Sequence, residues 1–320
     1  MSKKLIFMAS LLIAIIFFSI FIGPVKIPLD FWLLKNKSYY EIIIYDIRLP
    51  RIILSCIIGG SMSLAGAVYQ SVFRNPLASP DILGTAFGCA FGAAIGILLS
   101  GNLIFIQLFS LISGILSTLA VFYIAKKDEH IDILSIIISG IIVGSFFSSL
   151  LGLAKYFADP DNKLPAITFW LMGSFSDVGY KDVVIGLVCL IPIWVIYYKR
   201  WFLNVASLED EEAMALGFDI HKFRMLMIGL STLLVSISIS LVGIIGWVGL
   251  VVPHMARLVV GYDNKYVVVA SLIIGALFVL LCDDIARSLT TGEIPIGIVT
   301  SFISAPLFGF LYKMNYAKNK

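Results

Sequence analysis

Three arginines border apolar segments, and their chemistry is the easiest in this chain to specify. Arg48 and Arg51 are three residues apart in RLPR, and Arg287 ends the sequence DDIAR after a late apolar run. A guanidinium is a planar fork of N–H donors that pairs with a carboxylate through two hydrogen bonds. These side chains could therefore bind acidic groups of a partner. Alternatively, they snorkel or pair within the chain. The acidic residues available for pairing in the chain are Asp46, Asp283 and Asp284.

Residue patterns for other chemistry are missing from the sequence. It has no GxxxxGK[ST] phosphate loop, no HExxH zinc motif and no cluster of cysteine and histidine. Its 4 cysteines share no CxxC spacing and lie within apolar stretches, which favours small buried residues over a disulfide framework. His254 is expected to pack or to line a pore, because no other metal ligand accompanies it. We expect no catalytic residues, no metal site and no cofactor.

The composition indicates a polytopic membrane protein. Hydrophobic residues make up 60% of the chain and charged residues 13%, with a mean hydropathy of +1.01. Soluble domains carry about a quarter charged residues. The net charge of +3 is too small to indicate a nucleic-acid partner, and the basic residues lie between apolar runs. We expect a lipid membrane as the environment and no nucleic acid.

The apolar runs predict an all-α fold of about ten transmembrane helices. A signal peptide is the alternative for the first run, but the run is long enough to span and no small-residue cleavage site follows. The connector at 23–47 and the polar stretch at 155–181 are expected outside the helices. The helices are expected near 5–22, 51–70, 81–100, 103–125, 131–154, 182–198, 223–242, from 243 in an interrupted form, 266–286 and 295–313.

This count places both termini on one side of the membrane. The side with the termini carries more Lys and Arg, which predicts that it is cytoplasmic. Arg48, Arg51 and Arg287 then lie on the outer side, where arginine is not expected for topology. We therefore favour a partner contact for them, with pairing inside the chain as the alternative.

Small residues recur at helical spacing in two of the predicted helices. In the second, Ser55, Gly59, Ser63, Gly66 and Gln70 form one stripe, which in lipid allows another helix to approach closely. In the fifth, small residues recur every four positions. This second stripe is either a packing seam or the smooth wall of a wide pathway. Its members are Gly140, Gly144, Ser148 and Gly152.

A broken apolar helix marks a second candidate stretch of pathway. Gly243, Gly246, Gly249 and Pro253 interrupt the eighth run, and His254 follows directly. An interrupted helix at membrane depth is tolerated only against protein or a water-filled cavity. We assign Gly246, Gly249, Pro253 and His254 to the pathway. The end of the second helix joins this assignment with Gln70, Asn75 and Pro76.

The stretch 201–222 is predicted to be a cytoplasmic loop with two short helices. Ser207 with Asp210 resembles a capping box, Gly217 suits a helix end and Asp219 can begin the next helix. The acidic run from Glu209 to Glu212 is explained by the helix dipole alone.

Several motifs together resemble a known family. RLPR, GGSMSLAGAVYQ, FRNPLASPDILG, WLMGS and GIIGWVGLVVPHMARLVVG are similar to the permease subunits of type II ABC importers for iron-siderophores, haem and vitamin B12, the FecCD family. The resemblance implies one permease domain over 1–320, paired in a homodimer or with a related permease. It also implies two separate ATP-binding subunits, an extracytoplasmic substrate-binding protein, and a bacterial or archaeal cytoplasmic membrane.

The resemblance also implies roles for particular residues. Arg48, Arg51 and Arg287 match positions that pair with glutamates of the binding protein, and 204–217 matches the coupling helix that contacts the ATPase. Within that helix the candidate residues are Leu208, Glu209, Glu212, Ala213, Leu216 and Gly217. The expected cargo is an iron-siderophore, with cobalamin, haem and molybdate as alternatives. A secondary transporter or membrane enzyme is less favoured, because the sequence lacks inverted repeats and buried titratable groups.

Overall fold

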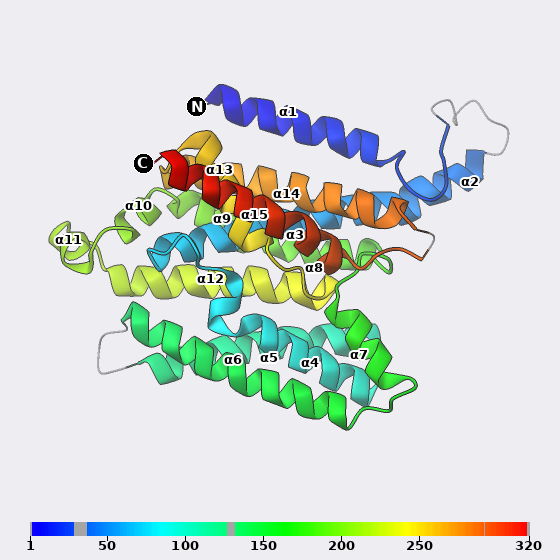
Figure 1. The fold of residues 1–320 in the computed structure, drawn as a ribbon, viewed down its shortest axis with the longest axis horizontal. Coiled ribbons are helices and arrows are strands. Elements are labelled where there is room, and N and C mark those ends of the chain that lie inside the picture. Colours follow the sequence, from blue (N-terminus) through cyan, green and yellow to red (C-terminus); the bar gives the residue numbers. More distant parts are fainter. Residues whose placement is uncertain (1, 29–36, 127–131, 291, 319–320) are drawn as a thin grey trace.

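A computed structural model describes residues 2–28, 37–126, 132–290 and 292–318, and the regular secondary structure in these ranges is all helical (Figure 1). Three apolar helices are shorter than a full span: α4 (Thr85–Leu99), α13 (Val248–Val260) and the apolar part, Ile296–Leu311, of α15 (Ile296–Lys318). Helix α1 (Ser2–Ser19) adds 18 further residues. Six helical segments are long and apolar enough to cross a membrane: Ser38–Val72, Leu103–Ala125 (α5), Ile133–Tyr156 (α6), Tyr180–Lys199, Ile220–Val242 (α12) and Asn264–Ser288 (α14). This set confirms the polytopic all-α prediction and is compatible with about ten transmembrane helices.

The first of these segments begins earlier than expected. Helix α2 (Lys37–Ile42), the π-helix η2 (Ile43–Arg48) and α3 (Leu49–Val72) follow one another directly. Because η2 runs directly into α3, Pro50 lies inside a continuous helical segment, where its missing N–H and its ring would disturb an ordinary α-helix. The wider turns of the π-helix η2 come immediately before Pro50, and the chain stays helical through this residue. The prediction of a connector until 47 was therefore wrong from Lys37 onward, and 29–36 lie outside the described residues.

The remaining elements are short. The turn after α3 contains the 3-10 helix η3 (Pro80–Leu83), and α4 begins at Thr85 after Gly84 in a left-handed conformation. The polar stretch after α6 contains α7 (Lys163–Leu171), a helix that the sequence did not predict. The next span is divided into α8 (Tyr180–Gly186), η4 (Leu187–Cys189) and α9 (Leu190–Lys199). Helices α10 (Phe202–Ala206) and α11 (Asp210–Ala215) precede α12.

Helix α3 lies at the centre of the fold, among α12, α13 and α14 (Figure 1). Its small-residue stripe permits direct backbone contact. A Cβ atom added to Gly59 would lie 2.2 Å from the carbonyl oxygen of Gly275 in α14, and one added to Gly66 would lie 1.8 Å from that of Gly249 in α13. The predicted close approach of other helices to this stripe is confirmed.

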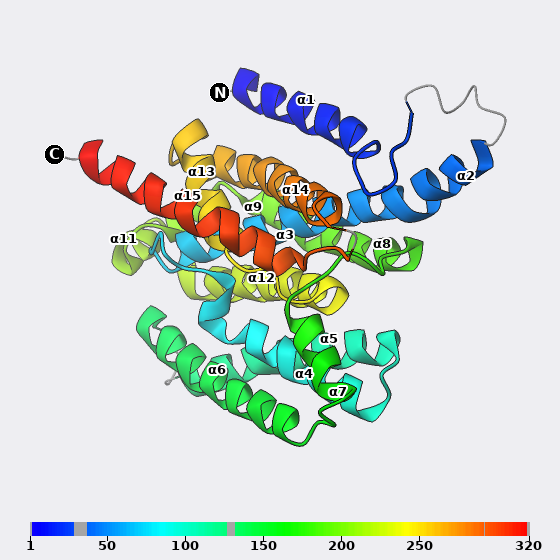
Figure 2. The ribbon, with the colours of Figure 1, turned by 45° about the vertical axis from the view of Figure 1, so that its right-hand side comes forward.

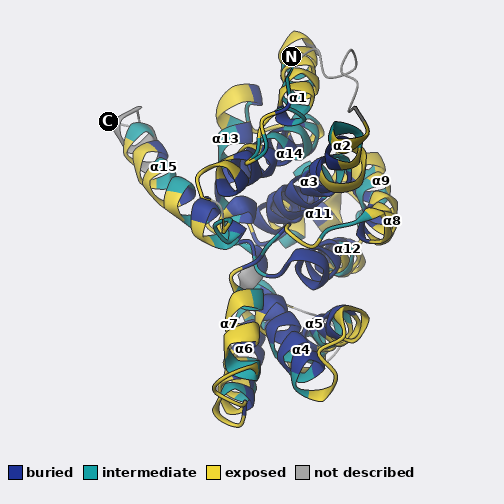
Figure 3. Cartoon of the chain, turned by 90° about the vertical axis from the view of Figure 1, so that its right-hand side faces the viewer, coloured by how far each residue is buried: buried dark blue, intermediate teal, exposed yellow. Residues whose placement is uncertain are grey.

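The helices form two groups (Figures 2 and 3). One contains α4 to α7, and the other contains α1, α3 and α12 to α14, with α15 along its side. Buried residues are concentrated in α3, α4, α12 and α14, whereas α6 and α15 present exposed faces (Figure 3). The two termini lie at the same end of the molecule as α11, and α2 lies at the opposite end (Figure 1).

An extended segment separates α12 from α13, so the predicted interruption exists. It begins at Gly243, with φ 75°, and ends at Trp247, with φ 70°. The N–H of Ser174 donates to the carbonyl of Val242 at 2.9 Å, and that of Ile296 donates to the carbonyl of Gly173 at 3.0 Å. A Cβ atom added to Gly243 would lie 2.3 Å from the carbonyl oxygen of Trp170, so the start of the interruption packs against protein, as non-helical backbone in lipid requires. Gly249 and Pro253 do not contribute to the break, because both lie inside the continuous helix α13, so this part of the prediction was wrong.

Candidate functional site

The three predicted arginines meet at the end of the molecule opposite the termini. Arg48 ends η2, Arg51 lies in the first turn of α3 and Arg287 in the last turn of α14. They are only 4%, 5% and 2% exposed. All three border one cavity of about 120 Å³, together with Glu293. They therefore form a single buried cluster.

Arg51 is enclosed by two carboxylates of its own chain. Its Nε donates to both oxygens of Asp283 at 2.9 and 3.0 Å, and its Nη2 donates to Oδ1 at 2.8 Å. Its Nη1 donates to both oxygens of Glu293 at 2.9 and 3.0 Å. Asp283 is fully buried, whereas the Glu293 side chain is 29% exposed. The pairing within the chain that the sequence left open is thus present at Arg51, with Glu293 as an additional partner.

Arg287 is also paired within the chain, but incompletely. Its Nη2 donates to Asp284 and, at 2.7 Å, to both the carbonyl and the hydroxyl oxygen of Ser19 in α1. Its Nε and Nη1 have no hydrogen-bond partner among the described residues. Buried guanidinium donors without an acceptor are costly. Arg287 therefore retains two donors beside the cavity.

Arg48 is held by backbone and not by a carboxylate. Its Nη1 donates to the carbonyl of Ile20 at 2.6 Å, and its Nη2 to that of Val25 at 2.5 Å. These carbonyls follow α1, so Arg48 joins the segment after α1 to the start of α3. The Asp46 partner that the sequence offered is not one of these acceptors.

Two predicted pathway glycines line a cavity of about 310 Å³ in the interior. Gly246, in the interruption before α13, and Gly249, in the first turn of α13, border it together with Ser79 and Pro80. A Cβ atom added to Gly249 would lie 2.6 Å from Cδ of Pro80, so the turn after α3 is packed directly on α13. The cavity is also lined by Met62, Ile245, Trp247 and Leu250.

Gln70, Pro253 and His254 lie near this cavity but are not among its lining residues. The Gln70 side chain donates to the carbonyl of Leu250 at 3.1 Å and accepts from Nη1 of Arg257. Pro253 is buried, and the ring of His254 packs edge-on against Phe308 with centroids 5.9 Å apart. The Gln70 amide is thus fixed by α13 on both of its polar atoms.

Asn75 and Pro76 form the turn after α3. The N–H of Asn75 donates to the carbonyl of Gln70 at 3.1 Å, and its side-chain oxygen accepts from the N–H of Leu77 at 2.9 Å. Pro76 is exposed. Arg74, just before them, has φ 51°, a conformation that few residues adopt without a compensating contact.

The stripe in α6 divides into two halves. Gly140 and Gly144 are buried against η3 and Gly84, and a Cβ atom added to Gly140 would lie 2.1 Å from the carbonyl oxygen of Ile82. Ser148 and Gly152 are exposed, and nothing lies within 4 Å of a Cβ atom added to Gly152. An open hollow of about 480 Å³ is lined by Ile82, Phe87, Gly140, Ile141, Gly144, Ser145, Ser148 and Ser149. The packing alternative is thus confirmed for Gly140 and Gly144, while Ser148 and Gly152 lie on an exposed face of α6 and their pathway role stays a prediction.

The loop before α12 contains two short helices, as predicted, but its capping differs. The N-cap of α11 is Glu209, and the Ser207 hydroxyl donates to Leu203 instead, so the proposed capping box was wrong. Gly217 ends the helix with φ 73°. Ala213 is fully buried within the chain, while Glu209 and Glu212 are exposed. The apolar surface of the loop is formed by the exposed side chains of Leu208, Met214 and Leu216.

Asp210 is a site residue that the sequence argument missed. It accepts hydrogen bonds from Arg224 in α12 at 2.6 and 2.8 Å and from Arg74 after α3. These two guanidinium groups, Arg224 first, lower the pKa of the Asp210 carboxyl to about 2. The available signal was Arg224, a lone arginine in an apolar run, which needs an anionic partner.

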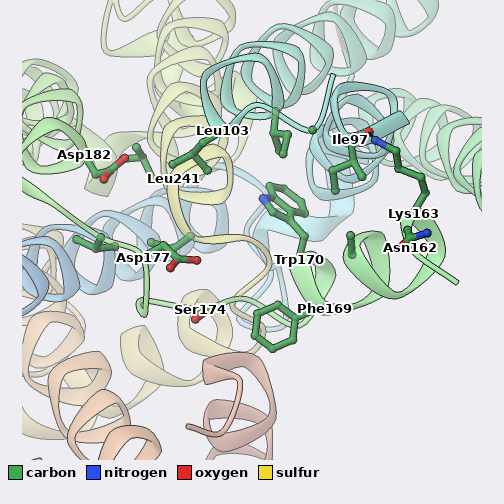
Figure 4. Close-up of a pocket in the computed structure, with 15 residues that line it drawn as sticks. Ile97, Leu103, Asn162, Lys163, Phe169, Trp170, Ser174, Asp177, Asp182 and Leu241 are labelled. Carbon is green, nitrogen blue, oxygen red and sulfur yellow. Dashed lines mark hydrogen bonds between the residues drawn. The ribbon is translucent and has the colours of Figure 1, made fainter. Parts of the chain in front are cut away.

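A further cavity, of about 430 Å³, lies between the α4–α5 turn, α7 and the end of α12 (Figure 4). Trp170 occupies its centre, and Lys163 and Asn162 lie at one end, with Asp177 and Asp182 at the other. Lys163 donates to the carbonyl of Ile97 at 2.8 Å, and Asp182 accepts from Gln107 at 2.9 Å. One polar side chain at each end, Lys163 and Asp182, thus has a partner in the chain. Nowhere in the described part of the chain do three or more His, Cys, Asp or Glu side chains gather as a metal site would require.

Sequence comparison identifies a family and relatives. The model of the FecCD transport family matches residues 11–314. The molybdate import system permease protein MolB of Haemophilus influenzae is 38% identical, over 85% of this chain and 81% of the relative. A Helicobacter pylori protein, named as an iron chelatin transport system permease, is 36% identical over 87% of this chain and 84% of its own length.

Structure comparison agrees with this family. An inward-facing structure, described as an ABC transporter of the metal-chelate type, superposes with a TM-score of 0.92 at 35% identity. The match covers 98% of this chain and 100% of the other. The similarity thus extends over nearly every element described above.

Proposed function

Because the chain belongs to the FecCD transport family and is a permease subunit of a type II ABC importer, we propose that it carries an iron-siderophore or similar metal chelate across the cytoplasmic membrane. The main support for this cargo is the TM-score of 0.92 to an ABC transporter of the metal-chelate type. The H. pylori iron chelatin relative supports the same cargo. Molybdate is the second candidate, because the H. influenzae relative is 38% identical. Cobalamin is a further alternative, because a cobalamin import permease of Halobacterium salinarum is 33% identical over 85% of this chain. Haem is an alternative from the resemblance alone.

We propose that the pathway follows the two hollows beside the broken helix and α6. The 310 Å³ cavity is lined by Gly246 and Gly249, and the 480 Å³ hollow by Gly140, Gly144 and Ser148. Small side chains leave room there that larger ones would fill. Gln70, Asn75, Pro76, Pro253 and His254 extend the proposed pathway toward the end of the molecule that holds the termini. Gly152 extends the α6 stripe toward the other end.

We propose that an extracytoplasmic binding protein docks on the cluster of Arg48, Arg51 and Arg287. The two unpaired donors of Arg287 support this role, because an approaching carboxylate would supply the acceptor they lack. The Glu293 carboxylate occupies Nη1 of Arg51 and is partly exposed, so a partner carboxylate could take its place. Docking would then replace the Arg51–Glu293 ion pair with an ion pair between Arg51 and a carboxylate of the binding protein.

The ATP-binding subunits would dock at the opposite end of the molecule. ATP would be bound by those subunits, and this chain would hold no cofactor. Leu208, Met214 and Leu216 form an exposed apolar surface beside Glu209 and Glu212, and Gly217 ends the helix that carries them. Ala213 would act from inside, by fixing α11 on the core. This end holds both termini and is proposed to be cytoplasmic.

A second permease, identical or related, is proposed to complete the pathway. Phe302 and Phe310 on α15 and Phe146 on α6 are exposed and apolar. Lipid or a second permease would cover such a face in a membrane. The unequal burial of α6, packed at Gly140 and open at Ser148, is consistent with a half-pathway that a second copy closes.

Reconstituted transport tests the function. The chain, its cognate ATPase and its binding protein are placed in proteoliposomes, and ATP-dependent uptake of a radiolabelled ferric siderophore is compared with that of molybdate. Saturable ferric-siderophore uptake, lost with a hydrolysis-deficient ATPase, is expected. Uptake of molybdate but not of the ferric siderophore would show that molybdate is the cargo. Uptake independent of ATP would overturn the importer assignment.

A further inference from the structure

Asp210, the first residue of α11, joins three parts of the chain. Nη1 and Nη2 of Arg224 donate to Oδ2 and Oδ1 of Asp210 at 2.8 and 2.6 Å, and Nη2 of Arg74 donates to Oδ1. Arg224 belongs to α12 and Arg74 to the turn after α3. One carboxylate therefore connects α11 to a central helix and to a turn.

The two arginines differ in their surroundings. The Arg224 side chain is 2% exposed, and its bidentate pair fixes α11 on the body of the protein. The Arg74 side chain is 27% exposed, and its backbone is held at φ 51°. The contact with Arg74 is thus an added link to the turn, which α11 does not need in order to stay on α12.

The turn that receives this link is rigid and leads directly to the proposed pathway. Asn75 is hydrogen-bonded to Gln70, to Leu77 and, through its carbonyl, to Ala78 at 3.0 Å. The next residues, Ser79 and Pro80, line the 310 Å³ cavity. Pro80 packs so closely on Gly249 that a Cβ atom there would lie 2.6 Å from its ring. Hydrogen bonds and packing thus connect Arg74 to the cavity wall without a gap.

We propose that Asp210 is a positioning residue that transmits movement of α11 to the pathway through Arg74 and the rigid turn at 74–80. The inference rests on the proposed function, in which ATPase subunits move α11. It assigns the transmission to one ion pair that neither the family match nor the predicted coupling residues identify.

The decisive variant is Arg74→Gln, because it removes the link to the turn and leaves the Arg224–Asp210 pair in place. In the reconstituted importer we expect normal assembly and normal ATP hydrolysis, with uptake per ATP reduced about fivefold. Arg74→Lys, which keeps the charge, should retain part of the uptake per ATP that Arg74→Gln loses. Lys222→Gln is the matched control, because it removes an exposed ion pair, with Asp219, on the same end. An Arg74→Gln ratio equal to that of the wild type overturns the proposal.

Spin labels give a readout that loss of stability would not produce. Exposed positions Leu77 in the turn and Glu211 in α11 are each labelled against Leu119 on α5. Nucleotide binding should change both distances in the wild type, and only the Glu211 distance in Arg74→Gln. A change of both distances in Arg74→Gln refutes transmission through this pair.

A third variant separates failure of this inference from failure of the proposed function. Leu216 is 68% exposed on the proposed ATPase surface, and Leu216→Asp should abolish ATPase binding. If binding persists, the coupling surface itself is wrong and the inference falls with it. If binding is lost while Arg74→Gln remains fully coupled, only the transmission through Asp210 is wrong.

Discussion

Arg51 in the first turn of α3 and Asp283 near the end of α14 are joined by hydrogen bonds of 2.8 to 3.0 Å, although they are 232 residues apart in the chain. Both side chains are buried, so each neutralises a charge that the interior would otherwise not tolerate. This pair joins α3 to α14 at the end of the molecule opposite the termini. It also determines how the proposed docking cluster can be tested.

Reversing the charge of Arg51 should destabilise the fold. In Arg51→Glu the new carboxylate would face Asp283 and Glu293 with no cation between them, and breaking a buried pair costs about 3–5 kcal/mol. Thermal unfolding in detergent should show a clear decrease in the midpoint. Lys181→Glu, at an exposed position near the same end, is the control and should change little. An unchanged midpoint in Arg51→Glu would mean that the ion pair is not formed.

Neutralising Glu293 tests docking without disturbing the buried pair. Glu293→Gln weakens the competitor for Nη1 of Arg51, so the affinity for the binding protein should rise roughly fivefold, equivalent to about 1 kcal/mol. Surface plasmon resonance with the purified permease complex measures this affinity. Asp161→Asn, at an exposed site in the α6–α7 loop, should leave the affinity unchanged. Equal or weaker binding in Glu293→Gln would argue against a partner carboxylate at Arg51.

Cysteine labelling tests the pathway assignment. On a background with Cys56 replaced by alanine, Ser148→Cys and Gly246→Cys should react with a membrane-impermeant cationic thiol reagent, because both positions border a hollow. Leu153→Cys, exposed on another face of α6, should remain unlabelled if lipid covers it. Labelling of Leu153→Cys alone would contradict the pathway assignment and favour a packing role for the α6 stripe.

Two glycine substitutions test the close approach of α3 and α13. Gly66→Val would drive Cβ into the carbonyl of Gly249, 1.8 Å away, and overpacking of this kind costs about 1–3 kcal/mol or more. Gly152→Val is the matched control in α6, where nothing lies within 4 Å. Fluorescence-detected size-exclusion after heating should show a loss of folded protein for Gly66→Val alone. Equal losses for both would contradict the direct backbone contact between these helices.

The Asp210 ion pairs should be insensitive to pH across the physiological range. Hydrogen bonds from Arg224 and Arg74 lower the pKa of Asp210 from 3.8 to about 2. A lowered pKa gives a stabilisation that is complete above the ordinary value and is lost only as the pH falls through about 2. The ratio of uptake per ATP between wild type and Asp210→Asn should therefore be constant from about pH 5 to pH 8. A step in this ratio within that window would show that another group titrates with the contact.

Much of the fold follows from local sequence patterns. Long apolar runs predict the spans because lipid offers no hydrogen-bond partner to exposed backbone. Gly243 and Gly246 predict a broken helix because glycine weakens a helix interior. Gly59 and Gly66 predict close packing because a missing Cβ lets another backbone approach. These properties depend on residue type and spacing, and the structure agrees with them.

Contacts between residues far apart in the chain were determined only by the tertiary structure. The carboxylates that face Arg51 lie 232 and 242 residues away in the chain, and the Arg74 guanidinium that faces Asp210 lies 136 residues away. Nothing in RLPR or LEDEE specifies these partners. The same applies to Ala213, which the resemblance places on the surface that contacts the ATPase and which packing buries within the chain. A helix pattern fixes the face on which a side chain lies, but the contacts of that face depend on how all the helices pack together. Ion pairs form only after this packing, because burial must be compensated by a specific opposite charge.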